Sequence, residues 1–332
     1  MRIPFEQLKA EFKRVLLKLS FSPEMADTCA SIFASNSRDG IYSHGLNRFP
    51  AFVKLVQKGL IQIHAKPERL ETIGAIERWD GKGGPGIANA DHCMNRAIEL
   101  AKANGIGCVS IKNTNHWMRG GTYGWQAADA GCIGICFTNA IANMPAWGGK
   151  DPVLGNNPLV IAIPRTGGHV VLDMAMSQFS YGKMQEYELK NETLPFPGGY
   201  DESGNLSTDP VAIRKTKLAL PIGFWKGSGL ALVLDLLAVA LSGGRSTEKI
   251  TADVDETGVS QCFICIHQPD MHPSLIEEIL LYTQSSSPVK PGTQVAYPGE
   301  HTLQTRIENE KNGIPVTTAP EFKDSINGIV RH

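Results

Sequence analysis

The spacing of apolar side chains changes twice along the chain, and this constrains the fold more than any other feature of the sequence. Over residues 5–19, apolar side chains recur at the intervals of a helix. Ser22 followed by Pro23 has the pattern of a cap and a first helical residue, and this second helix runs to about residues 39–40. A third helix is predicted from Pro50 to Gly59. The chain therefore begins with a small helical unit that contains no strands.

From about residue 70 onwards, segments typical of strands and of helices alternate. Strands are predicted at residues 70–79, 106–111, 134–138, 159–163, 169–174 and 261–267. Helices are predicted at residues 87–103, 121–130 and 229–241, and a long surface excursion is predicted at residues 187–210. Helical spacing returns at residues 273–284 and over roughly the last thirty residues.

The order of these segments predicts an α/β (α+β) fold with two domains. We assign residues 1–70 and 270–332 to a discontinuous outer helical domain, which encloses an α/β domain at residues 71–269. A chain of 332 residues is long enough for two domains. The order of the strands in the sheet does not follow from their spacing.

Composition and charge argue against several classes of protein. The formal net charge is -1 and no block of like charges occurs, so the sequence has no electrostatic footprint for nucleic acid or an anionic membrane. The longest apolar segment, Leu230–Leu241, is too short to span a bilayer and carries Asp235. The charged N-terminus resembles a helix rather than a signal peptide. Seven cysteines among apolar neighbours are typical of reduced thiols, so we expect a cytoplasmic protein.

The glycine-rich segment Gly81–Gly86 matches the G-x-G-x-x-G pattern of a dinucleotide-binding turn. Two details count against that function. The next strand is followed by Lys112 and Asn113, so no acidic residue is placed to bind a ribose hydroxyl. Pro85 also lacks the backbone N–H that would contact a phosphate. We therefore interpret the segment as a tight turn.

A loop before the third helix contains His44 and Arg48. Histidine titrates near neutral pH and can donate a proton to a developing alkoxide. Arginine binds a carboxylate through two parallel hydrogen bonds. The spacing allows both side chains to face one pocket, and a reductase of keto acids needs these two groups. The plain alternative is an exposed loop with one His and one Arg.

A second candidate loop contains Asn115, His116 and Arg119 beside a pair of glycines. It directly follows a predicted buried strand, where α/β enzymes place functional loops. The structural alternative is a histidine that is hydrogen-bonded within a turn. This loop is denser in polar groups than a plain turn requires.

Three further segments have both a binding and a structural interpretation. Trp225–Gly229 precedes the most apolar helix, and a helix N-terminus beside Lys226 is suited to bind a pyrophosphate. The structural alternative is that Ser228 simply caps the N-terminus of that helix. Asp173 ends a predicted strand, so it either binds a ribose or the nicotinamide amide or is an ordinary turn residue. Residues 298–301 have the pattern of a helix entrance.

We expect no metal site. Cys262 and Cys265 lack a second pair of ligands, and on an extended strand their thiols would point to opposite faces. His267 and His272 flank a loop with Asp270, an arrangement that is usually only surface. The G-x-S-x-G motif of serine hydrolases is missing from the sequence.

Five motifs, in the same order along the chain, resemble the type 2 malate/L-lactate dehydrogenase family. They are Tyr42–Gly45 with Asn47–Pro50, Asn115–Gly121, Asn156–Leu159, Asp173–Ala175 and Trp225–Gly229. The resemblance implies a non-Rossmann NAD-binding domain with a mixed or antiparallel sheet, and a homodimer with active sites near the subunit interface. Within the family, the sequence is most similar to members that reduce 2,3-diketo-L-gulonate at C2 with NADH to give 3-dehydro-L-gulonate. NADPH is the alternative cofactor.

The resemblance also implies roles for individual residues. His44 corresponds to the proton donor, His116 to a histidine credited with acid/base work in some relatives, and Arg48 would hold the C1 carboxylate. The implied cofactor contacts are His169, Val170, Val171, Leu172, Asp173, Met174, Ala175, Trp225, Lys226, Gly299, Glu300 and His301. Where many relatives have Thr, this chain has Asn156, so a hydroxyl is replaced by an amide.

Other functions remain open at this point. A related 2-hydroxyacid dehydrogenase would act on malate, lactate or ureidoglycolate. A metal-dependent sugar-acid hydrolase or lyase would use His44, His116 and Asp173, and its activity would be sensitive to chelators. A non-catalytic sugar-acid binding protein would use Arg48 and Lys226 to bind anions.

Overall fold

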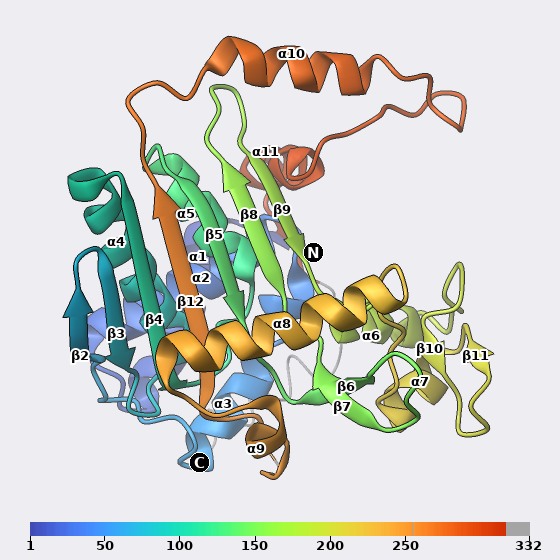
Figure 1. The fold of residues 1–332 in the computed structure, drawn as a ribbon, viewed down its shortest axis with the longest axis horizontal. Coiled ribbons are helices and arrows are strands. Elements are labelled where there is room, and N and C mark those ends of the chain that lie inside the picture. The colour runs from blue at the N-terminus through green and yellow to red at the C-terminus, as the bar shows by residue number, and fades with distance from the viewer. Residues whose placement is uncertain (254, 317–332) are drawn as a thin grey trace.

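The computed structural model, which describes residues 1–253 and 255–316, is built on a seven-stranded sheet with helices on both faces (Figure 1). One face is covered by α4 (Gly86–Asn104) and α5 (Gly120–Asp129), and the other is crossed by α8 (Trp225–Ser242). This arrangement confirms the predicted mixed α/β class. The assignment of two domains stays a prediction.

The N-terminal segment is helical, as its spacing predicted. It consists of α1 (Phe5–Lys18), α2 (Pro23–Arg38), the short 3₁₀ helix η1 (Tyr42–His44) and α3 (Phe49–Gln57). Ser22 caps α2, because its Oγ accepts a hydrogen bond from the backbone N of Met25 (3.2 Å). The helices pack through a cluster of buried aromatic rings, namely Phe12, Phe33, Phe49 and Phe52.

The spatial order of the main sheet differs from the order of its strands along the chain. The order is β2 (Glu68–Ile73), β3 (Ile76–Asp80), β4 (Ile106–Thr114), β12 (Val259–Ile266), β5 (Ile133–Thr138), β8 (Leu159–Ile163) and β9 (Val170–Met174). β3 and β4 are parallel and are connected by α4, whereas the other described neighbours are antiparallel. A Rossmann sheet is mostly parallel, so the predicted non-Rossmann topology is confirmed. β9 lies at one edge of the sheet.

The single strand predicted at residues 70–79 is wrong. The segment forms the hairpin of β2 and β3, with a turn at Gly74, whose φ of 58° favours glycine. The strand β2 is exposed along its whole length. Burial therefore imposes no clear alternation on it, and without alternation the spacing could not separate two strands.

The two cysteines of β12 face opposite sides of the sheet, as predicted. Cys265 packs in the core between the sheet and α4, with its Sγ 3.4 Å from Met94 Sδ. Cys262 belongs to the core beneath α8. All seven cysteines lie in the described part of the chain and are free thiols.

The helix α8 is longer than the predicted residues 229–241 and has one apolar face without a neighbour. By length and composition it is the one helix among the described residues that could cross a membrane, which is weak evidence by itself. Its Ala231, Leu234 and Ala238 are buried in the core that it forms with the sheet. Its Asp235 accepts hydrogen bonds from Asn139 Nδ2 (2.8 Å) and from the backbone N of Thr247 (3.2 Å). These contacts are those of a helix that covers a sheet.

Short elements at one end of the sheet were not predicted. They are β6 (Ala142–Pro145), β7 (Pro152–Gly155), α6 (Tyr181–Leu189), β10 (Gly199–Tyr200), β11 (Leu206–Ser207), α7 (Pro210–Thr216) and α9 (Thr247–Thr251). Most of the excursion predicted at residues 187–210 lies among them, with the hairpin of β10 and β11 at its centre. Elements this short contain too few turns or alternations to show a period.

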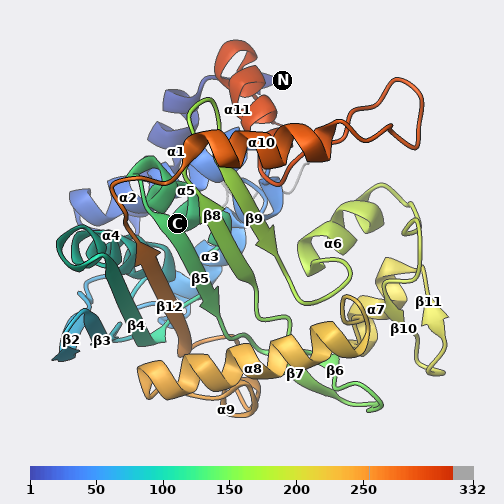
Figure 2. The same ribbon diagram turned by 45° about the horizontal axis from the view of Figure 1, so that its top comes forward.

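The C-terminal helices pass over the sheet and return to the N-terminal helices (Figure 2). α10 (Pro273–Gln284) lies beyond the ends of the strands, and α11 (Glu300–Asn312) contacts α2. β1 (Arg2–Ile3) pairs with β13 (Ile314–Pro315). The helical spacing predicted for the last thirty residues is thus confirmed for residues 300–312, and residues 317–332 lie outside the described residues.

Candidate active site

One cavity of about 780 Å³ brings together four of the polar residues that the sequence singled out. His44, Arg48, His116 and Asp173 all line it. They come from η1, the start of α3, the loop after β4 and the end of β9. The cavity has the size of a typical small-molecule site. The fold therefore brings together groups that lie far apart in the sequence.

His44 is held at the cavity by the packing of its loop against α2. Asn36 Nδ2 donates to the backbone O of His44 (2.9 Å), and the backbone N of Leu46 donates to Ser37 Oγ (2.9 Å). A Cβ on Gly45 would lie 2.3 Å from Ser37 Oγ. Only glycine permits this close approach of the loop to the helix.

The loop that carries His116 rests on the glycine-rich turn. Asn115 Nδ2 donates to the backbone O of Gly83 (2.8 Å) and of Gly84 (2.9 Å). A Cβ on Gly86 would lie 1.9 Å from the backbone O of Asn115. The segment is therefore a tight turn, as interpreted from the sequence, and its glycines allow close packing beneath a loop of the cavity.

The rings of His44 and His116 are stacked, with centroids 5.9 Å apart and 16° between their planes. Burial is the largest cause that lowers the pKa of each ring to about 3. The positive charge of Arg48 lowers both pKa values further, and the charge of His116 adds to the effect on His44. Both rings are therefore neutral near neutral pH while no anion occupies the cavity.

Arg48 places a cation in the cavity wall beside the two histidines. Its side chain lines the cavity from the residue before α3. Within residues 1–253 and 255–316, Arg48 forms neither an ion pair nor a side-chain hydrogen bond. Arg119, the other arginine beside the histidines, is engaged by carboxylates.

A buried ionic network connects the cavity to α11. Asp39, which is only 4% exposed, accepts hydrogen bonds from Arg119 Nη1 and from Arg306 Nε and Nη2, each 2.8 Å long. Arg119 Nε lies 3.7 Å from Asp173 Oδ2. The same oxygen accepts a hydrogen bond from the backbone N of Gly121 (2.9 Å). The position of Asp173 in the cavity wall thus depends on residues of α2, α5 and α11.

The two carboxyl groups of this network have opposite pKa shifts. Burial works to raise the pKa of Asp39, but the hydrogen bonds from Arg306 and the charge of Arg119 outweigh it and hold that pKa below its usual range. Burial raises the pKa of Asp173, and Arg119 and the Gly121 N–H only partly offset it. The carboxyl group of Asp39 is therefore ionised near neutral pH, whereas Asp173 takes up a proton more easily than Asp39 does.

Comparisons with known proteins settle the family of this chain. A family model described as malate/L-lactate dehydrogenase matches residues 3–320. The chain belongs to the malate/L-lactate dehydrogenase family. It is 46% identical over 322 residues to 2,3-diketo-L-gulonate reductase of Escherichia coli O6:K15:H31 (strain 536 / UPEC), covering 95% of this chain and 97% of that protein.

Solved structures agree with this assignment. The fold matches malate dehydrogenase from Entamoeba histolytica with a TM-score of 0.93 at 25% identity, covering 100% of this chain and 99% of the other. It matches sulfolactate dehydrogenase from Methanocaldococcus jannaschii with a TM-score of 0.89 at 28% identity, covering 99% and 96%. As a member of this dehydrogenase family, the chain is an oxidoreductase of hydroxy or keto acids, and the family indicates a nicotinamide cofactor.

The cofactor residues that the resemblance implies lie partly in the cavity wall and partly on β9 and its neighbours. Asp173 and Ala175 line the cavity itself. The preceding residues form β9, an edge strand that pairs with β8. Gly299 packs against this strand, since a Cβ there would lie 3.0 Å from the backbone N of Val171, which donates to Pro298 O (2.8 Å). Residues 299–301 and β9 are therefore adjacent.

Trp225 and Lys226 lie at the exposed N-terminus of α8. The backbone N of Ile222 donates to Met176 O (2.9 Å), which places this N-terminus beside the end of β9. The interpretation of Ser228 as a helix cap is wrong. The helix begins earlier, at Trp225, and the Oγ of Ser228 accepts a hydrogen bond from a loop backbone N at 2.8 Å.

His169 is bound within the protein through both ring nitrogens. Its Nδ1 accepts from the backbone N of Arg165 (3.0 Å), and its Nε2 lies 2.9 Å from Asp129 Oδ1. Glu300 Oε2 similarly accepts from the backbone N of Tyr297 (3.2 Å). These side chains shape the surface around β9 through contacts inside the protein.

The sequence analysis missed Glu256, which also lines the cavity. The backbone N of Ile141 donates to its Oε2 (3.2 Å). Burial raises the pKa of Glu256, and the hydrogen bond from Ile141 and the charge of Arg48 oppose that shift. An isolated Glu in a loop carries no sequence signal, so only the fold could identify it.

The residue that departs from the family pattern, Asn156, also lines the cavity. Its Oδ1 accepts a hydrogen bond from Asn143 Nδ2 (3.2 Å). The backbone O of Asn143 accepts from the hydroxyl of Tyr181 (2.9 Å). The amide therefore joins a polar wall to which the unpredicted elements β6 and α6 contribute.

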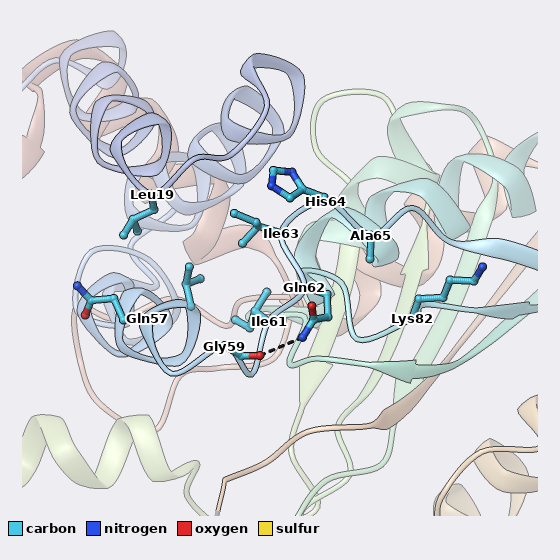
Figure 3. Close-up of a pocket in the computed structure, with 10 residues that line it drawn as sticks. Leu19, Gln57, Gly59, Ile61, Gln62, Ile63, His64, Ala65 and Lys82 are labelled. Atoms are coloured by element: carbon cyan, nitrogen blue, oxygen red, sulfur yellow. Dashed lines mark hydrogen bonds between the residues drawn. The ribbon is translucent and has the colours of Figure 1, made fainter.

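A second cavity, of about 590 Å³, lies beside the end of α1 and the segment after α3 (Figure 3). Leu19, Ile61, His64 and Lys82 contribute to its lining. Gln62 Nε2 donates to Gly59 O within the same segment (3.0 Å). None of the site residues predicted from the sequence lines this cavity, so it is separate from the candidate active site.

Proposed function

We propose that the chain reduces the C2 ketone of 2,3-diketo-L-gulonate with NADH and releases 3-dehydro-L-gulonate. The observation that carries the proposal is the convergence of His44, His116 and the unpaired Arg48 on one cavity that reaches the edge strand β9. A carboxylate anchor, a proton donor and a nicotinamide site are the parts that keto-acid reduction needs. The choice of this keto acid rests on the relatives that the chain most resembles.

Arg48 would hold the C1 carboxylate of the substrate. Its guanidinium forms no side-chain hydrogen bond or ion pair among the described residues, and the nearby carboxyl group of Glu256 lines the same cavity. A bidentate pair with the substrate would fix which carbon faces the cofactor. The stacked histidines line the same cavity. The ketone oxygen next to the carboxylate would then lie within their reach.

His44 would supply the proton, and substrate binding would make this possible. With a pKa of about 3 the ring is neutral in the empty cavity. A carboxylate on Arg48 neutralises one of the charges that disfavour the imidazolium and adds a nearby negative charge. We therefore expect the pKa of His44 to rise towards neutrality in the complex.

The residues around β9 fit a dinucleotide. When bound, NADH supplies the hydride that adds to C2. Asp173 and Ala175 would contact the nicotinamide end, and β9 with residues 299–301 would bind the part farther from the cavity. The exposed N-terminus of α8, with Lys226, would suit the pyrophosphate. The preference for NADH over NADPH follows from the resemblance.

We also propose a homodimer that covers the open face of the sheet. A row of half-buried apolar side chains crosses this face in register, comprising Cys108, Ile264, Ile135, Ile161 and Leu172. Beside it, α8 exposes Leu232, Val233, Leu236 and Leu237. Apolar surface of this extent is typical of an interface. We expect Leu236→Asp to give a monomer in light scattering, and a dimer of undiminished stability would contradict the proposal.

The proposed location is the cytoplasm.

The test of the function is a panel of 2-keto acids assayed with NADH and NADPH. We expect 2,3-diketo-L-gulonate with NADH to give the highest kcat/KM, above oxaloacetate and pyruvate. His44→Ala should lower kcat by about 10² or more with NADH binding retained, because the proton donor is lost. The proposal fails if no keto acid oxidises NADH, or if chelators abolish a reaction that needs no NADH.

A further inference from the structure

The two histidines of the cavity have different hydrogen-bond partners at Nδ1. His116 Nδ1 accepts a hydrogen bond from the backbone N–H of Met118 (2.9 Å). A backbone N–H can only donate, so Nδ1 of His116 must carry a lone pair. The proton of the neutral ring therefore sits on Nε2.

His44 Nδ1 instead lies 3.1 Å from Ser43 Oγ. A hydroxyl donates or accepts according to its rotation. When His44 is neutral, the hydroxyl can donate to Nδ1, and when the ring is charged, the hydroxyl can turn and accept from Nδ1–H. His44 therefore keeps its hydrogen bond in both protonation states.

His116 has no such freedom. A proton on its Nδ1 would face the Met118 N–H, and two donors cannot bond to each other. The Met118 N–H cannot easily turn away from Nδ1. The side chain of Met118 is buried in the core of the N-terminal helices, and this packing fixes the backbone at a φ of 67°. The flanking Trp117 O accepts from the hydroxyl of Tyr123 (2.8 Å), and Arg119 is bound to Asp39.

The charged groups around the rings act in the same direction. Arg48 faces both rings from the start of α3, and Arg119 acts on His44 from the loop before α5. An anion on Arg48 relieves this repulsion for both rings. Only His44, however, has a partner at Nδ1 that accommodates the added proton.

We propose that His116 stays neutral throughout the reaction and that its Nε2–H binds the substrate ketone oxygen, while His44 alone exchanges the proton. This inference rests on the proposed reductase function. As hydride adds to C2, the electron pair of the C=O π bond moves to the oxygen, which takes a proton from Nε2 of the His44 imidazolium. His44 becomes neutral and regains a proton from solvent when the next substrate carboxylate binds Arg48.

The first test reads the tautomer directly by ¹⁵N NMR of the histidine side chains in the whole protein. His169 is an internal reference, since its Nδ1 also accepts a backbone N–H, at 3.0 Å. We expect His116 to show the pattern of the neutral His169 tautomer, with the proton on Nε2, and to keep it between about pH 5 and 8. His116→Gln assigns the resonances. A proton on Nδ1 of His116, or its protonation in this range with a substrate analogue bound, would overturn the inference.

The second test separates the two histidines by kinetics. His116→Gln retains an N–H donor near the position of Nε2 but cannot titrate, so kcat should fall by no more than about tenfold, with the same pH profile. His116→Ala removes the donor and should lower kcat by about 10²–10³. His44→Gln should lose the alkaline limb of the profile, where kcat falls as the proton donor is deprotonated.

The opposite result is equally clear. A His116→Gln enzyme as slow as His116→Ala, and without the alkaline limb, would make His116 the proton carrier. If the wild-type protein reduces no keto acid at all, the proposed function fails, but the NMR experiment still decides the tautomer of His116.

Discussion

Replacement of Asp39 by Asn should destabilise the protein strongly, although Asp39 touches no substrate. Asp39 is the shared acceptor of Arg119 and Arg306, through three hydrogen bonds of 2.8 Å. Arg119 is itself only 5% exposed. The neutral amide of the Asp39→Asn variant would leave this buried guanidinium without its nearest anion, since Asp173 Oδ2 lies 3.7 Å from Arg119 Nε. Breaking a buried ion pair typically costs about 3–5 kcal/mol.

The expected shift in Tm follows from the length of the chain. Unfolding entropy is about 2.1 cal/mol/K per residue, which gives about 0.7 kcal/mol/K for 332 residues. A loss of about 3–5 kcal/mol therefore lowers Tm by about 4–7 °C. Calorimetry of the protein without ligands measures this shift.

The pH dependence gives a second check. The folded-state pKa of Asp39 is lowered from 3.8, so its ionisation stabilises the fold above that value, and this contribution is lost as the pH falls through the folded pKa. The difference between wild type and Asp39→Asn should be constant near neutral pH and shrink under acid conditions.

Asp27→Asn is the matched control. Asp27 pairs with Lys9 and Lys13 at 3.0 and 2.8 Å, but its side chain is 42% exposed. Surface pairs contribute about 0–1 kcal/mol, so Tm should fall by no more than about 1 °C. If Asp39→Asn and Asp27→Asn had the same small effect, the argument from burial would be refuted.

Three further predictions concern the cavity. Arg48→Lys replaces a bidentate anchor by a point charge, so the KM for the keto acid should rise about 10–100-fold with a smaller change in kcat. An unchanged KM in steady-state kinetics would show that Arg48 does not bind the substrate. Ser43→Ala removes the acceptor for Nδ1–H of the charged His44 ring and so lowers its pKa. The alkaline limb of the kcat profile should therefore move down by about one pH unit, and a limb that stays in place would contradict the two-way role of the hydroxyl. Burial raises the pKa of Glu256, so ionisation of this carboxyl group near neutral pH opposes folding. Glu256→Gln should therefore raise Tm by about 1 °C in calorimetry. A lower Tm would show that the carboxylate is stabilising.

The helical beginning of the chain and most of the sheet strands could be predicted from spacing, because those elements bury one face or both. The exposed hairpin of β2 and β3 carries no such constraint and was predicted as one strand. The order of the strands depends on pairings such as β12 with β4 and β5, between residues far apart in the chain. Local periodicity contains no information about such pairings.

Within the site, the polar loops of His44 and His116 were recognisable because each combines polar side chains with glycines at the end of an element. Their stacking in one cavity follows from the packing of α2 and the β4 loop around α5, which sequence spacing does not encode. Asp39 was predicted only as the end of a helix, and its two arginine partners lie at positions 119 and 306. A lone Asp gives no sign of such distant partners.

The cavity wall divides into a part that carries the chemistry and a part that comes from short elements and loops. His44, Arg48 and His116 stand on loops held by glycine contacts and by the long helices and strands. Asn143, Asn156 and Glu256 come from β6, the loop after β7 and a loop before β12. If this division is right, the first group sets the pH profile and the second selects among keto acids. Asn156→Thr, which restores the residue of many relatives, should therefore change the ratio of kcat/KM between 2,3-diketo-L-gulonate and oxaloacetate and leave the pH dependence of kcat in place. A shifted pH profile with an unchanged ratio would show that the two parts of the wall cannot be separated.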